Sequence, residues 1–221
     1  MKRKSIIYLC ALVVLASCSK GYSDPMDGQY DKPRKVEDIV TVKQDADGTV
    51  YLQSRGGERF YPGAGCPFER QQRAMCSMTI YAEEIPLYGH RVEVGWLEPL
   101  DEGLLYNVAD TDSKSSSDDG IDLLDDWITQ IGDGYLSVHY NAWWGEPAGL
   151  HYIGLEYEPG STSLTLVHDA AGDARDIYTD GMVCFDISSL FGDADGTQIT
   201  LNWTKTTGEK ASKKFEYDAR K

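Results

Sequence analysis

The chain has 221 residues, with 36 acidic against 21 basic side chains and a formal net charge of −15 at pH 7. This excess of negative charge repels phosphate backbones and anionic headgroups, which excludes nucleic acid and an anionic lipid surface as favoured partners. Helical periodicity is scarce, whereas 14 tyrosines accompany short alternating runs that are separated by 22 glycines. This pattern predicts an all-β protein.

The N-terminus predicts export and a lipid anchor. Three basic residues precede an apolar run over residues 6–15, which is too short to span a bilayer and is typical of a signal peptide. Residues 15–18, Leu-Ala-Ser-Cys, resemble a bacterial lipobox, in which the cysteine becomes the first mature residue and carries a lipid. We therefore expect removal of residues 1–17, lipidation of Cys18, a mature net charge of −18 and attachment to the outer membrane through acyl chains. An ordinary signal peptide with a nearby cysteine is the alternative.

The first folded region is predicted at 36–109, after a polar tether at 18–35. An Asp47-Gly48 turn joins apolar runs at 39–42 and 49–53, because Asp-Gly supplies the positive φ angles of a tight hairpin. Further strands are predicted at 59–61, 75–81 and 91–97. Five short strands are the content of a small OB-type barrel.

The second folded region is predicted at 121–221. The segment 110–120 contains no apolar side chain and predicts a linker between two domains. After it, seven alternating runs predict an immunoglobulin-like β-sandwich. These runs lie at 124–131, 135–143, 150–157, 162–168, 182–187, 197–203 and 212–217. The face expected to form the core comprises Leu136, Val138, Tyr140, Ile153, Leu155, Leu164, Leu166, Ile199, Leu201 and Trp203.

Three cysteines remain beyond Cys18 and the signal peptide, so at least one cannot pair within the chain. Cys66 and Cys76 could close a small loop or stay free. Cys184 lies in an apolar run, which predicts a small buried hydrophobic residue.

The pentapeptide Asp-Ala-Asp-Gly-Thr occurs twice, at 45–49 and 193–197. It begins like a calcium-binding loop, but neither copy has the glutamate that such a loop needs at its twelfth position. We therefore interpret both copies as Asp-Gly hairpin turns. No metal site and no cofactor site is predicted.

Two histidines are predicted to meet across one hairpin. If the four residues 158–161 form its loop, the register pairs Leu155 with Leu164 and His151 with His168. Two imidazoles could bind a transition metal or sense pH, but a stable metal site needs three or four ligands. We favour the interpretation in which each ring satisfies a backbone carbonyl.

Tyr140, Trp143 and Trp144 are the candidate binding residues. They lie close together before a Gly-Glu-Pro turn, and exposed aromatic side chains stack on sugars or anchor a protein partner. The alternative is that one tryptophan fills the end of the core while the other covers the loop. The sequence contains no nucleophile elbow, phosphate loop, zinc-protease motif or kinase motif, so it predicts neither a catalytic residue nor an enzyme.

Several stretches are similar to the NigD-like lipoproteins of Bacteroidetes. The most distinctive are Leu-Val-His-Asp-Ala-Ala-Gly-Asp at 166–173 and Gly-Met-Val-Cys-Phe-Asp-Ile-Ser-Ser-Leu at 181–190. Others lie at 57–62, 124–128, 134–140 and 151–155. The resemblance implies an OB-type barrel followed by a β-sandwich, an association with bacteriocin operons and an immunity role. Surface-exported lipoproteins of this phylum tend to carry an acidic run after the lipidated cysteine, and its absence after Cys18 favours the periplasmic leaflet.

Two functions remain open on these grounds. The first is a non-catalytic immunity or interaction protein, whose negative charge would attract a cationic peptide toxin. The second is a glycan-binding accessory lipoprotein that uses the aromatic cluster around Trp143 and Trp144. We favour the first, because no reactive group is visible and both predicted folds are common recognition modules.

Overall fold

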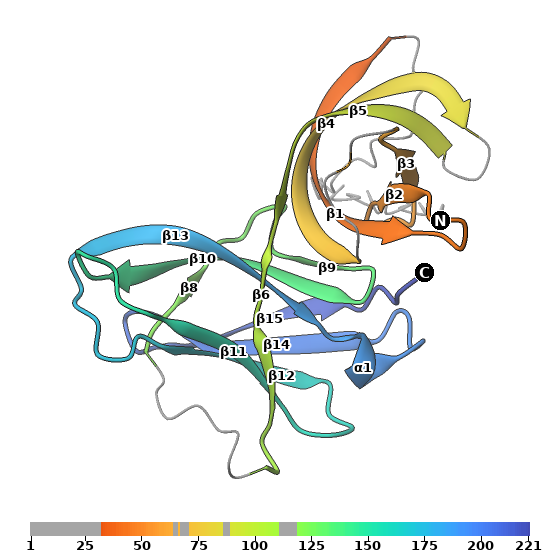
Figure 1. The fold of residues 1–221 in the computed structure, drawn as a ribbon. Helices are drawn as coiled ribbons and strands as arrows, with labels where there is room; N and C mark the ends of the chain where they lie inside the picture. Colours follow the sequence, from red (N-terminus) through yellow and green to blue (C-terminus); the bar gives the residue numbers. More distant parts are fainter. Residues whose placement is uncertain (1–31, 64–65, 67–70, 86–88, 111–118) are drawn as a thin grey trace, which may run out of the picture.

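The computed structural model describes residues 32–63, 66, 71–85, 89–110 and 119–221, with only the backbone given for 82–85. The predicted signal peptide, Cys18 and most of the tether lie outside these ranges. Nearly every regular element is a strand, so the all-β prediction is confirmed (Figure 1). No helix within the described ranges is long and apolar enough to cross a membrane.

The N-terminal part is a closed five-stranded barrel in the order β1-β2-β3-β5-β4, as predicted (Figure 1). Its strands are β1 (Arg34–Gln44), β2 (Val50–Gln53), β3 (Arg59–Tyr61), β4 (Gln72–Ile85) and β5 (Gly89–Pro99). The predicted Asp47-Gly48 turn joins β1 to β2, and Gly48 has a φ of 88°, which glycine adopts without steric cost. Apolar residues at alternate positions, among them Val40, Phe60 and Ile80, fill the interior of the barrel.

The rest of the chain forms a sandwich of two sheets (Figure 1). The first sheet has the order β6-β13-β10-β8, with β9 paired to β10, and we call it the barrel-side sheet. It contains β6 (Asp101–Glu102), β8 (Asp122–Leu123), β9 (Gln130–Gly132), β10 (Tyr135–Trp144) and β13 (Ile177–Asp186). The second, which we call the far sheet, has the order β15-β14-β12-β11-β7. It contains β7 (Leu104–Asn107), β11 (Tyr152–Tyr157), β12 (Ser163–Asp169), β14 (Gln198–Thr204) and β15 (Lys210–Glu216), and the single turn α1 (Ser188–Phe191) follows β13.

The sandwich begins earlier in the chain than the sequence led us to expect. β6 and β7 lie within the region 36–109 that we assigned to the barrel, yet β6 pairs with β13 and β7 pairs with β11, both in parallel. Parallel pairing joins segments far apart in the sequence, so the local pattern at 101–107 gave no sign of it. The expected linker at 110–120 therefore connects two strands of the sandwich, and its residues 111–118 lie outside the described part.

The core of the sandwich is the one predicted from alternation. All ten residues of the expected core face either belong to the buried cluster or, in the case of Ile153, pack against it. Tyr217 and Ala219 complete this cluster from beyond the last strand. Apolar alternation thus decided correctly which face of these strands points inward.

The barrel packs directly on the outer face of the barrel-side sheet. Ile39 of β1 lies in one apolar cluster with Tyr135 of β10 and Cys184 of β13. Beside this cluster the Lys43 ammonium contacts the Asp133 carboxylate at 2.7 Å, and the two side chains are only 6% and 0% exposed. A buried ion pair of this kind is costly to break, because the remaining buried charge loses its counter-ion. The sequence did not predict this buried contact between barrel and sandwich.

The three described cysteines are free thiols. Cys76 and Cys184 are buried, and burial raises the pKa of each thiol to about 12, so both are unreactive at neutral pH. Cys184 is the buried hydrophobic residue that its sequence context predicts. Cys66 and Cys76 do not form the loop-closing disulfide that we left open.

The two copies of the repeated pentapeptide have different structures. The copy at 45–49 is the predicted hairpin turn, in which the Asp45 side chain accepts backbone N–H groups of Asp47 and Thr49. The copy at 193–197 connects α1 to β14, so the prediction of a second hairpin turn is wrong. There the Asp195 carboxylate accepts the backbone N–H of Ala219 at 2.9 Å. Asp45 and Asp195 therefore both accept backbone N–H groups, the first within a hairpin turn and the second outside one. The sequence of the pentapeptide does not distinguish these two settings.

Candidate functional site

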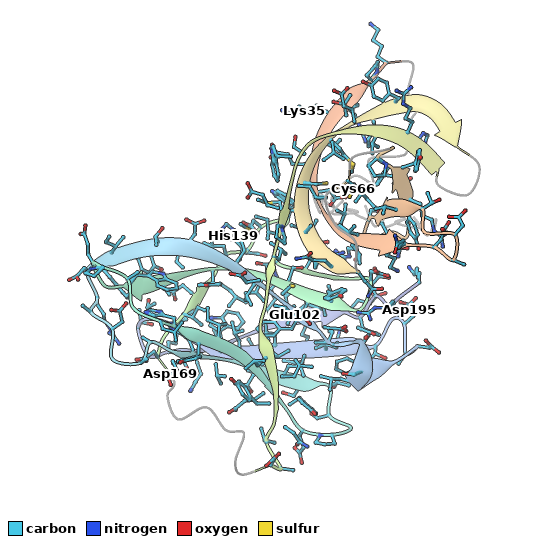
Figure 2. All side chains as sticks on the ribbon, viewed as in Figure 1. Lys35, Cys66, Glu102, His139, Asp169 and Asp195 are labelled. Atoms are coloured by element: carbon cyan, nitrogen blue, oxygen red, sulfur yellow. The ribbon has the colours of Figure 1, made fainter. Side chains whose placement is uncertain are left out.

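Strand alternation builds an accessible surface on the outer face of the barrel-side sheet. On β10 the even-numbered residues enter the core, so Asn141 and Trp143 point outward. The β10 to β13 register places Asp180 opposite Asn141 and Tyr178 opposite Trp143. His139, two residues before Asn141, lies on the same face, on the side that the barrel occupies (Figure 2).

An exposed aromatic pair forms one end of this face. The ring centroids of Trp143 and Tyr178 are 5.1 Å apart with an interplanar angle of 46°, and the residues are 38% and 43% exposed. The Tyr178 hydroxyl donates a hydrogen bond to Asp122 at 2.7 Å, which holds its ring across the sheet. Two large aromatic side chains exposed side by side are a common feature of binding surfaces.

Two carboxylates, Asp122 and Asp180, lie beside the aromatic pair, and Arg175 shares a small hollow with Trp143. Partial burial acts to raise the pKa of Asp122, but hydrogen bonds from Thr206 and Tyr178 lower it overall. A hydrogen bond to His139 lowers the pKa of Asp180. Both groups are therefore ionised at neutral pH, and the face combines apolar ring surface with negative charge.

His139 links two carboxylates at the middle of the face. Its Nδ1 lies 2.5 Å from Asp126 and its Nε2 lies 3.2 Å from Asp180. Desolvation acts to lower the pKa of His139, but the hydrogen bonds to the two carboxylates outweigh it and raise the pKa. Protonation of the ring completes both contacts, because only the imidazolium has two N–H donors.

A second polar group lies at the end of the sandwich core. His151 Nδ1 is 2.9 Å from His168 Nε2, so the predicted pair of histidines does meet. The register is shifted by two residues from the one we expected, because Leu155 pairs with Leu166 and Ile153 with His168. His151 itself lies just before β11 and reaches the pair from the loop.

Both histidines have a further partner outside the pair. His168 Nδ1 faces the backbone carbonyl of Gly120 at 3.3 Å, as the favoured interpretation predicted for both rings. His151 Nε2 instead contacts the Asp173 carboxylate at 3.0 Å, so that interpretation describes His168 and not His151. Desolvation lowers the pKa of His168, and the neighbouring His151 lowers it further. Backbone N–H groups of Gly145 and Gly149 hold the pKa of Asp173 at about 2, so this carboxylate anchors the loop after β10. The described residues contain no group of three potential ligands that could hold a metal ion.

A family model decides how the fold is related to known proteins. Residues 105–217 match the model of the NigD-like C-terminal β-sandwich domain. The chain belongs to the NigD-like family. The resemblance noted in the sequence is thereby confirmed, whereas a search of curated proteins gave no match.

Solved structures extend the likeness to the whole NigD-like fold. A protein of Parabacteroides distasonis, provisionally described as toxin-related, has 23% identity and a TM-score of 0.68, with 84% of this chain and 94% of that chain covered. A NigD-like immunity protein of Bacteroides caccae has 19% identity and a TM-score of 0.56, with 82% and 96% covered. A provisionally described lipoprotein of Bacteroides fragilis has 13% identity and a TM-score of 0.60, with 85% and 100% covered. At these identities the likeness shows a shared fold.

The three predicted binding residues do not share one exposed surface in this NigD-like protein. Tyr140 enters the core and is 5% exposed, and Gly181 leaves room for it, since a Cβ there would lie 2.6 Å from the tyrosine hydroxyl. Trp144 stacks on His151 with ring centroids 3.9 Å apart, so one face of its indole is covered. Only Trp143 is exposed. The alternative in which one tryptophan closes the core end describes Trp144.

The sequence missed Tyr178, which completes the aromatic pair. The strand predicted at 182–187 begins five residues too late, because the exposed first half of β13 has no apolar alternation to reveal it. The signal that could have found Tyr178 is the antiparallel register between β10 and β13, which extends without interruption to Ile177. Such a register is a long-range property and cannot be obtained from one strand.

A hollow of about 550 Å³ on the barrel is another concave surface of the protein. Two of its charged groups are engaged with Tyr81: the Arg91 guanidinium lies 5.5 Å from the centroid of the tyrosine ring, and the tyrosine hydroxyl donates to Glu93 at 2.7 Å. The lining also includes the partly buried thiol of Cys66. These side chains do not form a nucleophile and base pair.

Proposed function

We propose that this NigD-like protein is a non-catalytic binding protein of the cell envelope that captures a cationic peptide on the outer face of the barrel-side sheet. The observation that carries the proposal is the exposed pair of Trp143 and Tyr178 among ionised carboxylates. Lysine and arginine side chains bind to aromatic faces, and the attraction is worth about 0.5–2 kcal/mol. Neighbouring carboxylates such as Asp180 add ion pairs and longer-range attraction.

An immunity role is consistent with this chemistry. The structural relative from Bacteroides caccae is named a NigD-like immunity protein, and a cationic peptide toxin is a target that a chain of net charge −15 would attract. Capture at the cell surface or in the periplasm would keep such a toxin from its target. Cells that express the protein should survive a cationic bacteriocin of a neighbouring strain better than cells that lack it, and equal killing would contradict this role.

The envelope location rests on the lipid anchor. We propose that Cys18 carries it and that the protein is held at the outer membrane, facing the periplasm, because the four residues 15–18 match a lipobox in full and no acidic run follows. A solved relative from Bacteroides fragilis is also described, provisionally, as a lipoprotein. The variant Cys18→Ala should no longer incorporate labelled fatty acid; incorporation at the wild-type level would contradict the anchor.

Binding of lysine-rich and arginine-rich peptides tests the proposed site. We expect saturable binding in isothermal titration calorimetry, and a loss of affinity of at least about tenfold in the double variant Trp143→Ala, Tyr178→Ala. Asp180→Asn should weaken binding less, because that carboxylate is 58% exposed and lies at the rim of the site. A matched control is Tyr152→Ala, which removes an exposed aromatic residue of the far sheet. Equal losses in the control and the double variant would contradict the location of the site.

The geometry gives less support to the glycan-binding alternative at this cluster. Tyr140 is buried, Trp144 is stacked on His151, and the exposed rings of Trp143 and Tyr178 are tilted by 46°. These rings do not form the flat platform that suits a sugar ring. Saturable sugar binding that Trp143→Ala abolishes would favour the alternative over the peptide.

A further inference from the structure

The outer face of the far sheet carries a second aromatic surface, and strand alternation explains it. Leu105 and Ile153 pack against the core, so their neighbours Leu104, Tyr106 and Tyr152 point outward. β7 pairs in parallel with β11, with Leu104 opposite Gly154. Three large side chains from two neighbouring strands therefore meet on one face.

Gly154 makes this surface flat. A Cβ at this position would lie 2.2 Å from Cε2 of Tyr106 and 2.7 Å from its Cδ2. The ring of Tyr106 thus rests on the backbone of β11 in the space that any other residue would fill. Glycine in the interior of a strand commonly marks such a close approach.

The surface is open, and two carboxylates border it: Asp169 pairs with Tyr152, and Glu156 pairs with Tyr106. Leu104 is 62% exposed and Tyr152 is 51% exposed. Val167, which pairs with Gly154 on the other side of β11, is an apolar neighbour and is buried. Unlike the tilted pair of Trp143 and Tyr178, the ring of Tyr106 lies on a strand backbone, which suits the stacking of a flat ligand.

A polar hollow continues the same face across β12, β14 and β15. Its volume is about 440 Å³, and its polar lining residues Thr165, Asn202, Lys210 and Ser212 are joined by Trp203 and Ala211. Thr165 pairs with Glu156 of β11, and Glu156 pairs in turn with Tyr106. The aromatic surface and the polar hollow are therefore separated by a single strand position. The hydroxyls of Thr165 and Ser212 can donate and accept hydrogen bonds there, whereas the Asn202 amide nitrogen already donates to Ser163 and Leu164.

We propose that the outer face of the far sheet is a binding site for an oligosaccharide. A sugar ring has an apolar face of C–H groups and a rim of hydroxyls, and Tyr106 and Tyr152 match the first while the polar hollow matches the second. One ring stacks on the tyrosines, and the following units extend into the hollow beside Asn202. This site lies on the opposite side of the sandwich from the proposed peptide site and does not depend on it.

A microarray of plant and bacterial oligosaccharides, followed by calorimetry with the best-bound member, tests the site. Tyr106→Ala and Tyr152→Ala should each weaken binding at least about tenfold, because each removes a stacking surface. Gly154→Ala should also weaken it, since the added methyl group displaces the ring of Tyr106. Tyr152→Phe keeps the ring and should retain most of the affinity. Circular dichroism and thermal melts would establish that each variant is folded.

Trp143→Ala is the matched control on the other face and should leave sugar binding unchanged. Absence of binding across the array would overturn the proposal, and so would binding that depends on Trp143 instead of the tyrosines. Concentration-dependent dimerisation that Leu104→Ser and Tyr152→Ala abolish would overturn it too, because the face would then be an interface between two copies. A protein that bound sugar at the tyrosines but bound no peptide would contradict only the proposed peptide site. The two proposals can therefore be tested independently.

Discussion

The two outer faces of one sandwich present aromatic side chains in contrasting settings. On the barrel-side sheet, Trp143 and Tyr178 are a tilted cross-strand pair, with Asp180 in the neighbouring pair on that face and Asp122 bonded to the Tyr178 hydroxyl. On the far sheet, Tyr106 lies flat over Gly154, and Tyr152 stands two residues along the same strand. Asp169, labelled in Figure 2, lies opposite Tyr152 at the end of that sheet. Both faces carry carboxylates, so the difference teaches that the support of the aromatic rings determines which ligand a face suits: a tilted partner ring on one face and a glycine backbone on the other.

The largest expected effect is on the free energy of unfolding and concerns Tyr140, which lies in the core beneath the barrel-side sheet. Tyr140→Ala should lower the free energy of unfolding by about 3–5 kcal/mol, because it leaves a cavity in the core below that face. Tyr152→Ala on the far face should change it by no more than about 0.5 kcal/mol, since that side chain is half exposed. Urea denaturation measures both. Similar costs for the two variants would contradict the assignment of Tyr140 to structure and Tyr152 to a surface.

A glycine substitution tests how tightly the far face is built. Gly154→Val should destabilise the protein by about 1–3 kcal/mol, because the new side chain overlaps the ring of Tyr106. Adding Tyr106→Ala to Gly154→Val should recover part of this loss, since it removes the overlapping ring. A double variant as unstable as the sum of the single variants would show that the two residues do not interact.

Two histidines should give the sandwich opposite responses to pH. The pKa of His168 is lowered by burial, so as the pH falls below 6.5 the unfolded chain binds a proton that the folded chain does not, and stability decreases. The pKa of His139 is raised by its contacts with Asp126 and Asp180, so its contribution is full below pH 6.5 and is lost as the pH rises through the folded value. His168→Gln should therefore flatten the acid loss, whereas His139→Gln should make it steeper. Denaturation midpoints between pH 5 and pH 8, within the usual range of histidine titration, measure the slopes; equal slopes in all three proteins would contradict both assignments.

The salt dependence of ligand affinity should differ between the two faces, and this is the smallest of the expected effects. The Debye length falls from about 10 Å at 0.1 M to about 3 Å at 1 M salt, so peptide binding among the carboxylates should weaken several-fold over this range. Sugar binding on the far face should change little, because stacking on tyrosines involves no net charge. Titrations at both ionic strengths check this, and a salt-independent peptide affinity would contradict the role of the carboxylates.

Local alternation predicted the barrel and the sandwich core, whereas His151 meets His168 although the register from which we expected their pairing is wrong. Alternation did not predict which residues of two paired strands lie opposite each other. The hairpin register was wrong by two residues because the turn after Tyr157 is longer than the four residues assumed: Ser161 bonds back to Glu158 and pairing resumes only with Leu164. Tyr178 and Tyr106 escaped notice for a different reason, since β13 and β7 reach their faces through partners far away in the sequence.

The most direct test of the proposed function is to locate a bound cationic peptide on the protein. In a titration followed by nuclear magnetic resonance, with the backbone amides and the tryptophan indoles assigned, the account predicts concentration-dependent shifts at Trp143, Tyr178 and Asp180. The far face around Tyr106 and Tyr152 should remain unchanged in the same titration. Shifts centred on the far face or on the barrel hollow, or no shift at any concentration, would contradict capture by the aromatic and acidic face.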